Sequence, residues 1–197
     1  MQRYRPFICP FEDLIGEVPA GASMLDIGCG SGLFLGLLAA SGHSFSGTGV
    51  DISRDGISLA EQMAGRLTAS GSNADLRFIH LAAGNAWPSE RFGVTAMIDV
   101  LHHVAPAEQE ETIRRACRVT ALGGTLLYKD MCGDSTWRAA ANRLHDLILA
   151  RQWIHYVPPA RVEHWAREEG FELVLSQRSN RMWYGHDLRV FRCRRAA

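Results

Sequence analysis

Lysine is nearly absent from this sequence: Lys129 is the only one among the 21 basic residues, and arginine supplies the others. The 21 acidic residues balance these charges, so the formal net charge is zero at pH 7. A domain that binds nucleic acid through its phosphates usually carries an excess of positive charge. The composition therefore gives no electrostatic reason to expect a nucleic-acid partner.

Patterned cysteines and long apolar runs are missing as well. The five cysteines show no C-x-x-C spacing, which favours free thiols in a reducing cytosol over a disulfide framework or a zinc site. No 18 apolar residues occur in succession, and the N-terminal residues lack the apolar core of a signal peptide. At 197 residues the chain can bury one good core. We therefore expect a single cytoplasmic domain, residues 1–197, with no metal and no membrane partner.

Strand-like and helix-like segments alternate along the chain. Such alternation predicts an α/β fold in which a parallel sheet is covered by helices on both faces. Gly123-Gly124 is expected to end the third helix, and Tyr184–Asp187 to form the turn of a terminal hairpin. The predicted helices cover 33–40, 54–69, 106–120 and 159–169, with a further helix inside 134–157, and the predicted strands after the first cover 45–53, 76–81, 94–101, 125–131, 171–177 and 188–195.

The most informative segment is a glycine-rich turn within residues 24–39, MLDIGCGSGLFLGLLA. An acid and three glycines at alternate positions connect an apolar strand to an apolar helix: Asp26, Gly28, Gly30 and Gly32. Glycines at such a turn let the backbone approach a ligand closely. The spacing departs from the G-x-G-x-x-G of dinucleotide sites, because Leu33 stands where the third glycine belongs. The preceding acid also suits a cationic ligand better than a pyrophosphate.

This D-x-G-x-G-x-G turn resembles the signature of class I methyltransferases that use S-adenosylmethionine (SAM). The resemblance implies a Rossmann-like, seven-stranded sheet that is mostly parallel with an antiparallel last strand, in agreement with the terminal hairpin. It also implies an acid near the amino end of the cofactor. The residues that would line the cofactor are Asp26, Gly28, Cys29, Gly30 and Gly32.

Further cofactor contacts are expected after the next two strands. Asp51 closes the strand that follows the glycine turn, where an acid can accept hydrogen bonds from both ribose hydroxyls. Nicotinamide sites use the same arrangement, so Asp51 indicates a ligand that contains adenosine but does not distinguish SAM from a nicotinamide dinucleotide. Ile52 would pack on the adenine. Similar methyltransferases carry a Gly-Asp pair about five residues before a proline, and the Asp side chain contacts the adenine. Counting back from Pro88, two alanines stand at these positions, which leaves the backbone N–H of Ala83 as the adenine contact. In an alternative alignment, Gly84-Asn85 corresponds to the pair.

Two adjacent histidines follow the fourth strand in the segment IDVLHHV. In similar small-molecule methyltransferases this segment lies under the methionine part of SAM, which implies a cofactor contact for Asp99. Imidazole titrates near neutral pH, so His102 and His103 are candidates for a general base. Because one of two adjacent histidines usually points into the core, we predict His103 as the base and His102 as the packing residue. Motifs of DNA-base and glutamine methyltransferases are missing from this segment.

Residues 131–157 separate the fifth strand from the last helix and are predicted to form an inserted substrate lid. Ligands in open α/β sheets bind beyond the carboxyl ends of the strands, where this segment begins. Its aromatic residues favour a small substrate that is partly apolar or aromatic. The predicted substrate contacts are Lys129, Asp130, Trp137, His155 and Tyr156.

These features together predict a SAM-dependent methyltransferase that acts on a small molecule, as a monomer or homodimer. Oxygen is favoured over nitrogen or carbon as the acceptor atom, because of the aromatic segment and the histidines. Two alternatives stay open, a non-catalytic SAM-binding partner subunit and an NAD(P)-dependent oxidoreductase. Asp26 and Leu33 count against the second.

Overall fold

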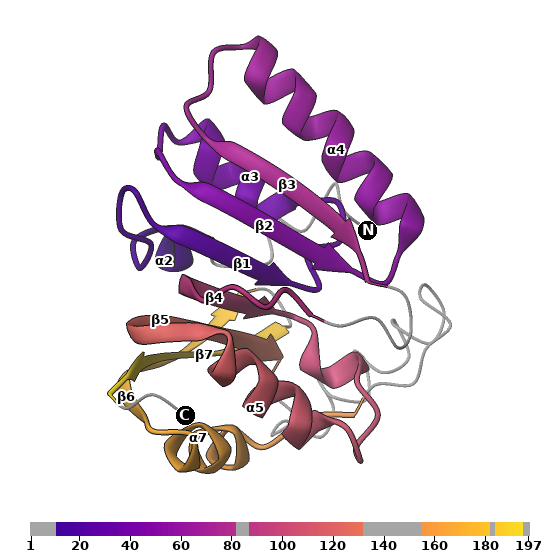
Figure 1. The fold of residues 1–197 in the computed structure, drawn as a ribbon. Helices are drawn as coiled ribbons and strands as arrows, with labels where there is room; N and C mark the ends of the chain where they lie inside the picture. The colour runs from indigo at the N-terminus through magenta and orange to yellow at the C-terminus, as the bar shows by residue number, and fades with distance from the viewer. Residues whose placement is uncertain (1–10, 82–86, 132–154, 182–183, 195–197) are drawn as a thin grey trace.

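A computed structural model of the protein describes residues 11–81, 87–131, 155–181 and 184–194. Its strands form one seven-stranded sheet in the order β3-β2-β1-β4-β5-β7-β6 (Figure 1). The first five are parallel, and β7 runs antiparallel to both of its neighbours. This confirms the predicted fold class. The strands are β1 Ser23–Ile27, β2 Ser46–Asp51, β3 Asp75–His80, β4 Phe92–Ile98, β5 Thr120–Met131, β6 Phe171–Arg181 and β7 Tyr184–Cys193.

Helices cover both faces of this sheet. A buried apolar cluster on one face includes Ile113 of α5 and Trp165 of α7, and a second cluster on the other face includes Phe11 of α2 and Leu35 of α3. In the part of the chain that the structure describes, no helix is both long and apolar enough to cross a membrane. The helices are α2 Phe11–Ile15, α3 Leu33–Ala40, α4 Arg54–Ala69, the 3-10 helix η2 Leu101–His103, α5 Gln109–Arg118 and α7 Pro159–Glu168.

Local sequence signals place α3 and α4 correctly, whereas α2 was not predicted. α3 has the predicted bounds, and α4 begins directly after Ser53. The Ser53 hydroxyl oxygen accepts a hydrogen bond from the N–H of Gly56 at 3.0 Å, which satisfies one of the free donors of the first turn. This fixes the start of α4 immediately beyond the end of β2, and therefore fixes the two residues that follow Asp51.

The prediction around Gly123-Gly124 was wrong. α5 ends at Arg118, and both glycines lie inside β5, which begins at Thr120. The pairing with β4 jumps from Phe92↔Thr120 to Val94↔Thr125, so β5 carries extra residues at this point. A Cβ on Gly124 would lie 2.9 Å from the carbonyl oxygen of Gly93. Glycine therefore permits a close approach of two irregular strands here and does not end a helix.

The terminal hairpin turns earlier than predicted. Residues 184–187 are paired within β7 and do not form a turn, since Gly185 is opposite Asn180 and His186 is opposite Ser179. The same strand pairs with the end of β5, where Asp187 is opposite Asp130. The hairpin therefore extends to the carboxyl end of the parallel strands, where polar residues gather.

Candidate functional site

The candidate site lies where the strand order of the sheet reverses. From β1 the chain proceeds outward through β2 to β3 and then returns to β4 on the other side of β1. Open α/β sheets bind ligands at such a switch point, beyond the carboxyl ends of the strands. The segments that meet there are the glycine turn after β1, residues 51–53 after β2, residues 99–103 after β4, and the end of β5.

All three glycines of the turn have positive φ, for different reasons. A Cβ on Gly28 would lie 2.5 Å from a methyl group of Val100, and one on Gly32 would lie 2.8 Å from Met63 Cε. These two positions allow close packing. Gly30 has φ +55, and a Cβ there would meet no atom within 4 Å. Its backbone therefore borders open space, as a ligand-facing position requires.

Asp51 ties the end of β2 to the glycine turn. Its two carboxylate oxygens accept hydrogen bonds of 2.7 Å from the N–H groups of Gly30 and Ser53. The residue is half-buried, and each carboxylate oxygen has a second lone pair for a further donor. Ile52, beside it, exposes 76% of its surface. An acceptor for hydroxyl groups and an exposed apolar side chain thus stand next to each other.

Asp26 and Cys29 are buried beneath the turn. Asp26 lies in β1 with 3% of its surface exposed, and Cys29 exposes 7%. Burial raises the pKa of the Cys29 thiol well above its usual range, and the carboxylates of Asp26 and Asp51 raise it further. The thiol is therefore neutral at physiological pH, and the backbone of Cys29 is hydrogen-bonded to Val50 and Gly32 within the protein.

Asp99 follows β4 in an unusual backbone conformation. With φ +55 it is the one non-glycine residue of positive φ among the residues described. Its carboxylate oxygens lie 2.6 and 2.7 Å from Nζ of Lys129, which is fully buried, and its N–H donates to the Lys129 carbonyl. Lys129 therefore does not border the site itself, and it acts on the site by holding the Asp99 carboxylate. Strain of this kind persists only where surrounding contacts enforce it, and it concentrates at functional sites.

Asp130 holds the neighbouring histidine. His102 and Asp130 expose 2% and 4% of their surfaces, and the ring Nδ1 of His102 is hydrogen-bonded to the carboxylate. The same carboxylate accepts the N–H groups of His102 at 3.2 Å and Met131 at 2.8 Å. Burial, followed by the charge of Asp130, raises the pKa of the Tyr128 phenol well above its usual range. Asp130 is therefore an internal acceptor that fixes His102 and the end of β5.

His103 has the opposite environment, because it is exposed. Its ring centroid lies 4.0 Å from that of His102, with the planes inclined at 47°. The imidazole that can reach a ligand is thus supported by one that is fixed in the interior. The burial of His102 and the exposure of His103 agree with the prediction that His102 is the packing residue, and the role of His103 as the base stays a prediction.

The end of the 131–157 segment is also attached here. The His155 N–H donates to the His102 carbonyl at 2.8 Å. The amide of Gln109 donates to the carbonyls of Leu101, Val104 and His155 at 3.0–3.3 Å. Gln109 was not predicted from the sequence. Its position four residues before Ile113 places it on the buried face of α5, and a polar residue on a buried face was a usable signal. His155 and Tyr156 are half-buried, whereas the predicted site residues Trp137 and Ala83 lie outside the described residues.

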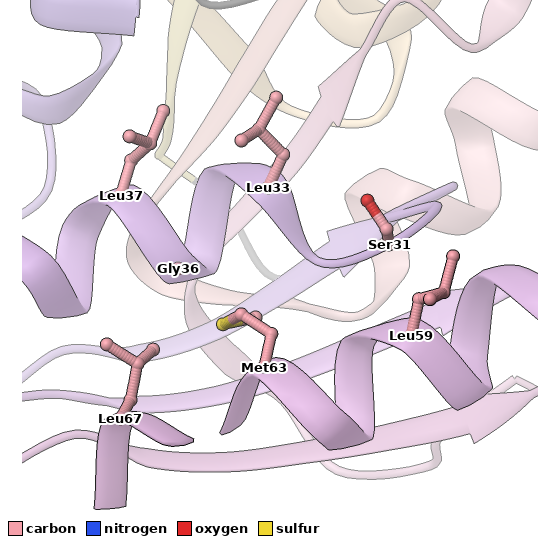
Figure 2. Close-up of a pocket in the computed structure, with 7 residues that line it drawn as sticks. All are labelled: Ser31, Leu33, Gly36, Leu37, Leu59, Met63 and Leu67. Carbon is pink, nitrogen blue, oxygen red and sulfur yellow. The ribbon is translucent and has the colours of Figure 1, made fainter. Parts of the chain in front are cut away.

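An apolar groove runs beside the site between α3 and α4 (Figure 2). A Cβ on Gly36 would lie 2.9 Å from Met63 Sδ, so glycine lets the two helices approach each other. Ser31, in the glycine turn, is the polar residue of the lining. The groove has a volume of about 310 Å³ and is lined by Ser31, Leu33, Gly36, Leu37, Leu59, Met63 and Leu67.

Known proteins share this sequence pattern and fold. A family model described as a methyltransferase domain matches residues 1–176. The ubiquinone biosynthesis O-methyltransferase of Azoarcus sp. (strain BH72) is 25% identical over 163 residues, which are 79% of this chain and 66% of that protein. The chain thus spans just under two thirds of that relative's length.

Solved structures show the same fold at lower identity. Magnesium protoporphyrin IX methyltransferase (ChlM) from Synechocystis PCC 6803, with bound SAH, superposes with a TM-score of 0.71 at 17% identity, over 92% of this chain and 80% of that one. The [4+2]-cyclase SpnF superposes with a TM-score of 0.69, also at 17% identity, over 91% and 78% of the two chains. These likenesses establish the fold, and the site must be interpreted from its own residues.

Proposed function

The chain belongs to the methyltransferase domain family, and from that premise we propose that it transfers a methyl group from SAM to an oxygen of a small, partly apolar acceptor. The observation that carries the proposal is the glycine turn, which is open at Gly30 and hydrogen-bonded to Asp51. After β4, the exposed ring of His103 packs against the buried ring of His102, which is hydrogen-bonded to Asp130. The oxygen preference draws support from the O-methyltransferase named among the relatives.

The residues present fit SAM. The open backbone at Gly30 leaves room for the ligand chain, and Asp51 has lone pairs for the ribose hydroxyls. The exposed side chain of Ile52 offers an apolar surface to the adenine. The carboxylate of Asp26 adds negative charge beneath the turn, which favours a ligand with an ammonium and a sulfonium. Leu33 and Asp26 together count against a dinucleotide.

When bound, SAM supplies an activated methyl group on a sulfonium, so the chain needs chiefly to align the acceptor and exclude water. Asp99 and Lys129 fix the turn that follows β4, and Val100 packs against the glycine turn. His103 takes the proton of the acceptor hydroxyl on its imidazole as the new O–C bond forms. Asp130 and His102 act as positioning residues for His103, and His155 and Tyr156 border the acceptor.

Asp51 provides a test of cofactor recognition. In Asp51→Ala the ribose acceptor is lost, and we expect the affinity for S-adenosylhomocysteine (SAH) to fall by about 1–3 kcal/mol, as for hydrogen bonds to a charged acceptor. Isothermal titration calorimetry measures the change. Asp55→Ala is the matched control, because it removes an exposed acid of the same charge from the first turn of α4. Equal affinities of the two variants would place ribose recognition elsewhere.

The reaction itself is tested with SAM that carries a labelled methyl group and a panel of small phenols and catechols, beside matched amines. We expect label on a phenolic oxygen and production of SAH. Label on the amines alone would overturn the oxygen preference. SAH binding without transfer to any acceptor would favour the non-catalytic SAM-binding subunit. SpnF, a cyclase that shares the fold, shows that the fold alone does not decide whether methyl transfer takes place.

A further inference from the structure

His80 contacts the candidate site from β3, a strand that has contributed no residue to the site so far. It is the last residue of β3 and lies opposite Asp51 in the parallel pair of β3 with β2. Its ring nitrogen Nε2 lies 3.1 Å from the carbonyl oxygen of Ile52. The next residue, Leu81, donates its N–H to the Asp51 carbonyl at 2.8 Å. The end of β3 thus holds two successive backbone carbonyls, those of Asp51 and Ile52, on either side of the Ile52 Cα.

The chemistry of this contact determines the state of the ring. A carbonyl oxygen only accepts hydrogen bonds, so Nε2 of His80 carries the hydrogen and donates it. The imidazolium form keeps a hydrogen on the same nitrogen, so the contact survives protonation. His80 therefore acts here as a fixed donor.

The carbonyl that accepts the hydrogen bond from His80 belongs to Ile52, whose apolar side chain is exposed at the site. Ile52 exposes 76% of its surface, more than any other large apolar residue of the described ranges. The preceding Asp51 is held by Gly30 and Ser53, and Ser53 in turn caps α4. His80 adds the contact at the middle of this three-residue segment. In Figure 1, β2 and β3 end side by side next to the start of α4.

We infer that His80 is a positioning residue for the adenosine half of the cofactor: by holding the Ile52 carbonyl, it orients the Asp51–Ser53 segment that receives adenine and ribose. The inference rests on the proposed function. It assigns part of the cofactor affinity to a residue of β3 that makes no contact with the ligand itself.

Three substitutions distinguish the effect of losing the N–H donor of His80 from the effect of changing the size of its side chain. His80→Gln keeps an N–H donor near the position of Nε2, His80→Asn places its amide nearer the position of Nδ1, and His80→Leu has no donor. Calorimetry is done with SAH and with 5′-methylthioadenosine, which lacks the amino-acid part. We expect His80→Gln to bind both ligands within about twofold of wild type, and the other two variants to bind both about 3- to 10-fold more weakly, as for one hydrogen bond.

The outcomes separate the positioning role of His80 from the proposed function. Wild-type affinity in His80→Leu and His80→Asn would overturn the positioning role alone. A loss seen with SAH but absent with 5′-methylthioadenosine would also overturn it, because the effect would then lie at the amino-acid half. A wild-type protein that binds neither ligand would overturn the proposed function and the inference with it. Thermal melting of each variant, expected close to wild type for this half-buried residue, shows that the comparison is made on folded protein.

Discussion

Replacing Lys129 by methionine is expected to lower the free energy of unfolding by about 3–5 kcal/mol, the effect of removing one member of a buried ion pair. Lys129 has no exposed surface, and its ammonium contacts both carboxylate oxygens of Asp99. In Lys129→Met the Asp99 carboxylate loses this counter-ion while it stays mostly buried. Asp99, at φ +55, keeps its backbone hydrogen bond to residue 129 but loses the side-chain contact that helps to hold this conformation. Urea denaturation measures the change.

The double variant Asp99→Asn/Lys129→Met is the control for this prediction. It removes the charge together with its partner, and asparagine tolerates the left-handed conformation of residue 99. We expect it to recover most of the lost stability, because replacing both members of a buried pair is often neutral. If the single variant is as stable as wild type, or the double variant is no better than the single one, the pair does not hold this turn.

Replacing His103 by alanine is expected to lower kcat about 10²- to 10⁴-fold with almost unchanged SAM affinity, the usual contribution of a positioned general base. His103 is the exposed member of the pair, and its ring is supported by His102. Since imidazole accepts a proton only in its neutral form, the pH–rate profile of the variant should also lose its acidic limb. Initial rates against pH, with the acceptor found in the phenol panel, measure both effects.

His102→Ala is the matched comparison, because it removes the same ring one residue away. We expect this variant to melt at a lower temperature, since the buried Asp130 carboxylate loses its imidazole partner. Its kcat should fall less than that of His103→Ala. The reverse order would mean that the buried histidine reaches the acceptor, and equal wild-type rates would mean that transfer proceeds by alignment alone.

The parts of the fold that were predicted depend on local signals. The glycine turn, the bounds of α3 and the Ser53 cap are each set by residues within a few positions of one another. The class I resemblance, which rests on one such turn, is confirmed by the family match over residues 1–176. The apolar residues that α5 buries, Ile113, Ala116 and Cys117, follow helical spacing in the same way. Spacing and capping are sufficient where the neighbours along the chain are also the neighbours in space.

The contacts that organise the site were beyond such reasoning, because they join residues about thirty positions apart. Lys129 meets Asp99 and Asp130 meets His102 only because β4 and β5 are paired in one register, which the irregularity near Gly93 and Gly124 helps to set. The charged residues at the end of β5 were predicted to contact substrate. The structure instead gives them partners inside the protein, through which they support the turn after β4. Their side chains alone could not indicate this.

The central claim is that the glycine turn binds SAM, and calorimetric titration with SAH tests it most directly, beside Gly30→Val and Gly42→Val. Both glycines have positive φ, +55 and +84, and a Cβ at either would meet no atom within 4 Å, so the two variants carry similar backbone strain. Only Gly30 borders the proposed ligand. The account predicts that SAH binds wild type and Gly42→Val at one site per chain, that Gly30→Val does not bind it although it is folded, and that NAD binds none of them. Binding of NAD as tight as that of SAH, or SAH affinity unchanged in Gly30→Val, would contradict it.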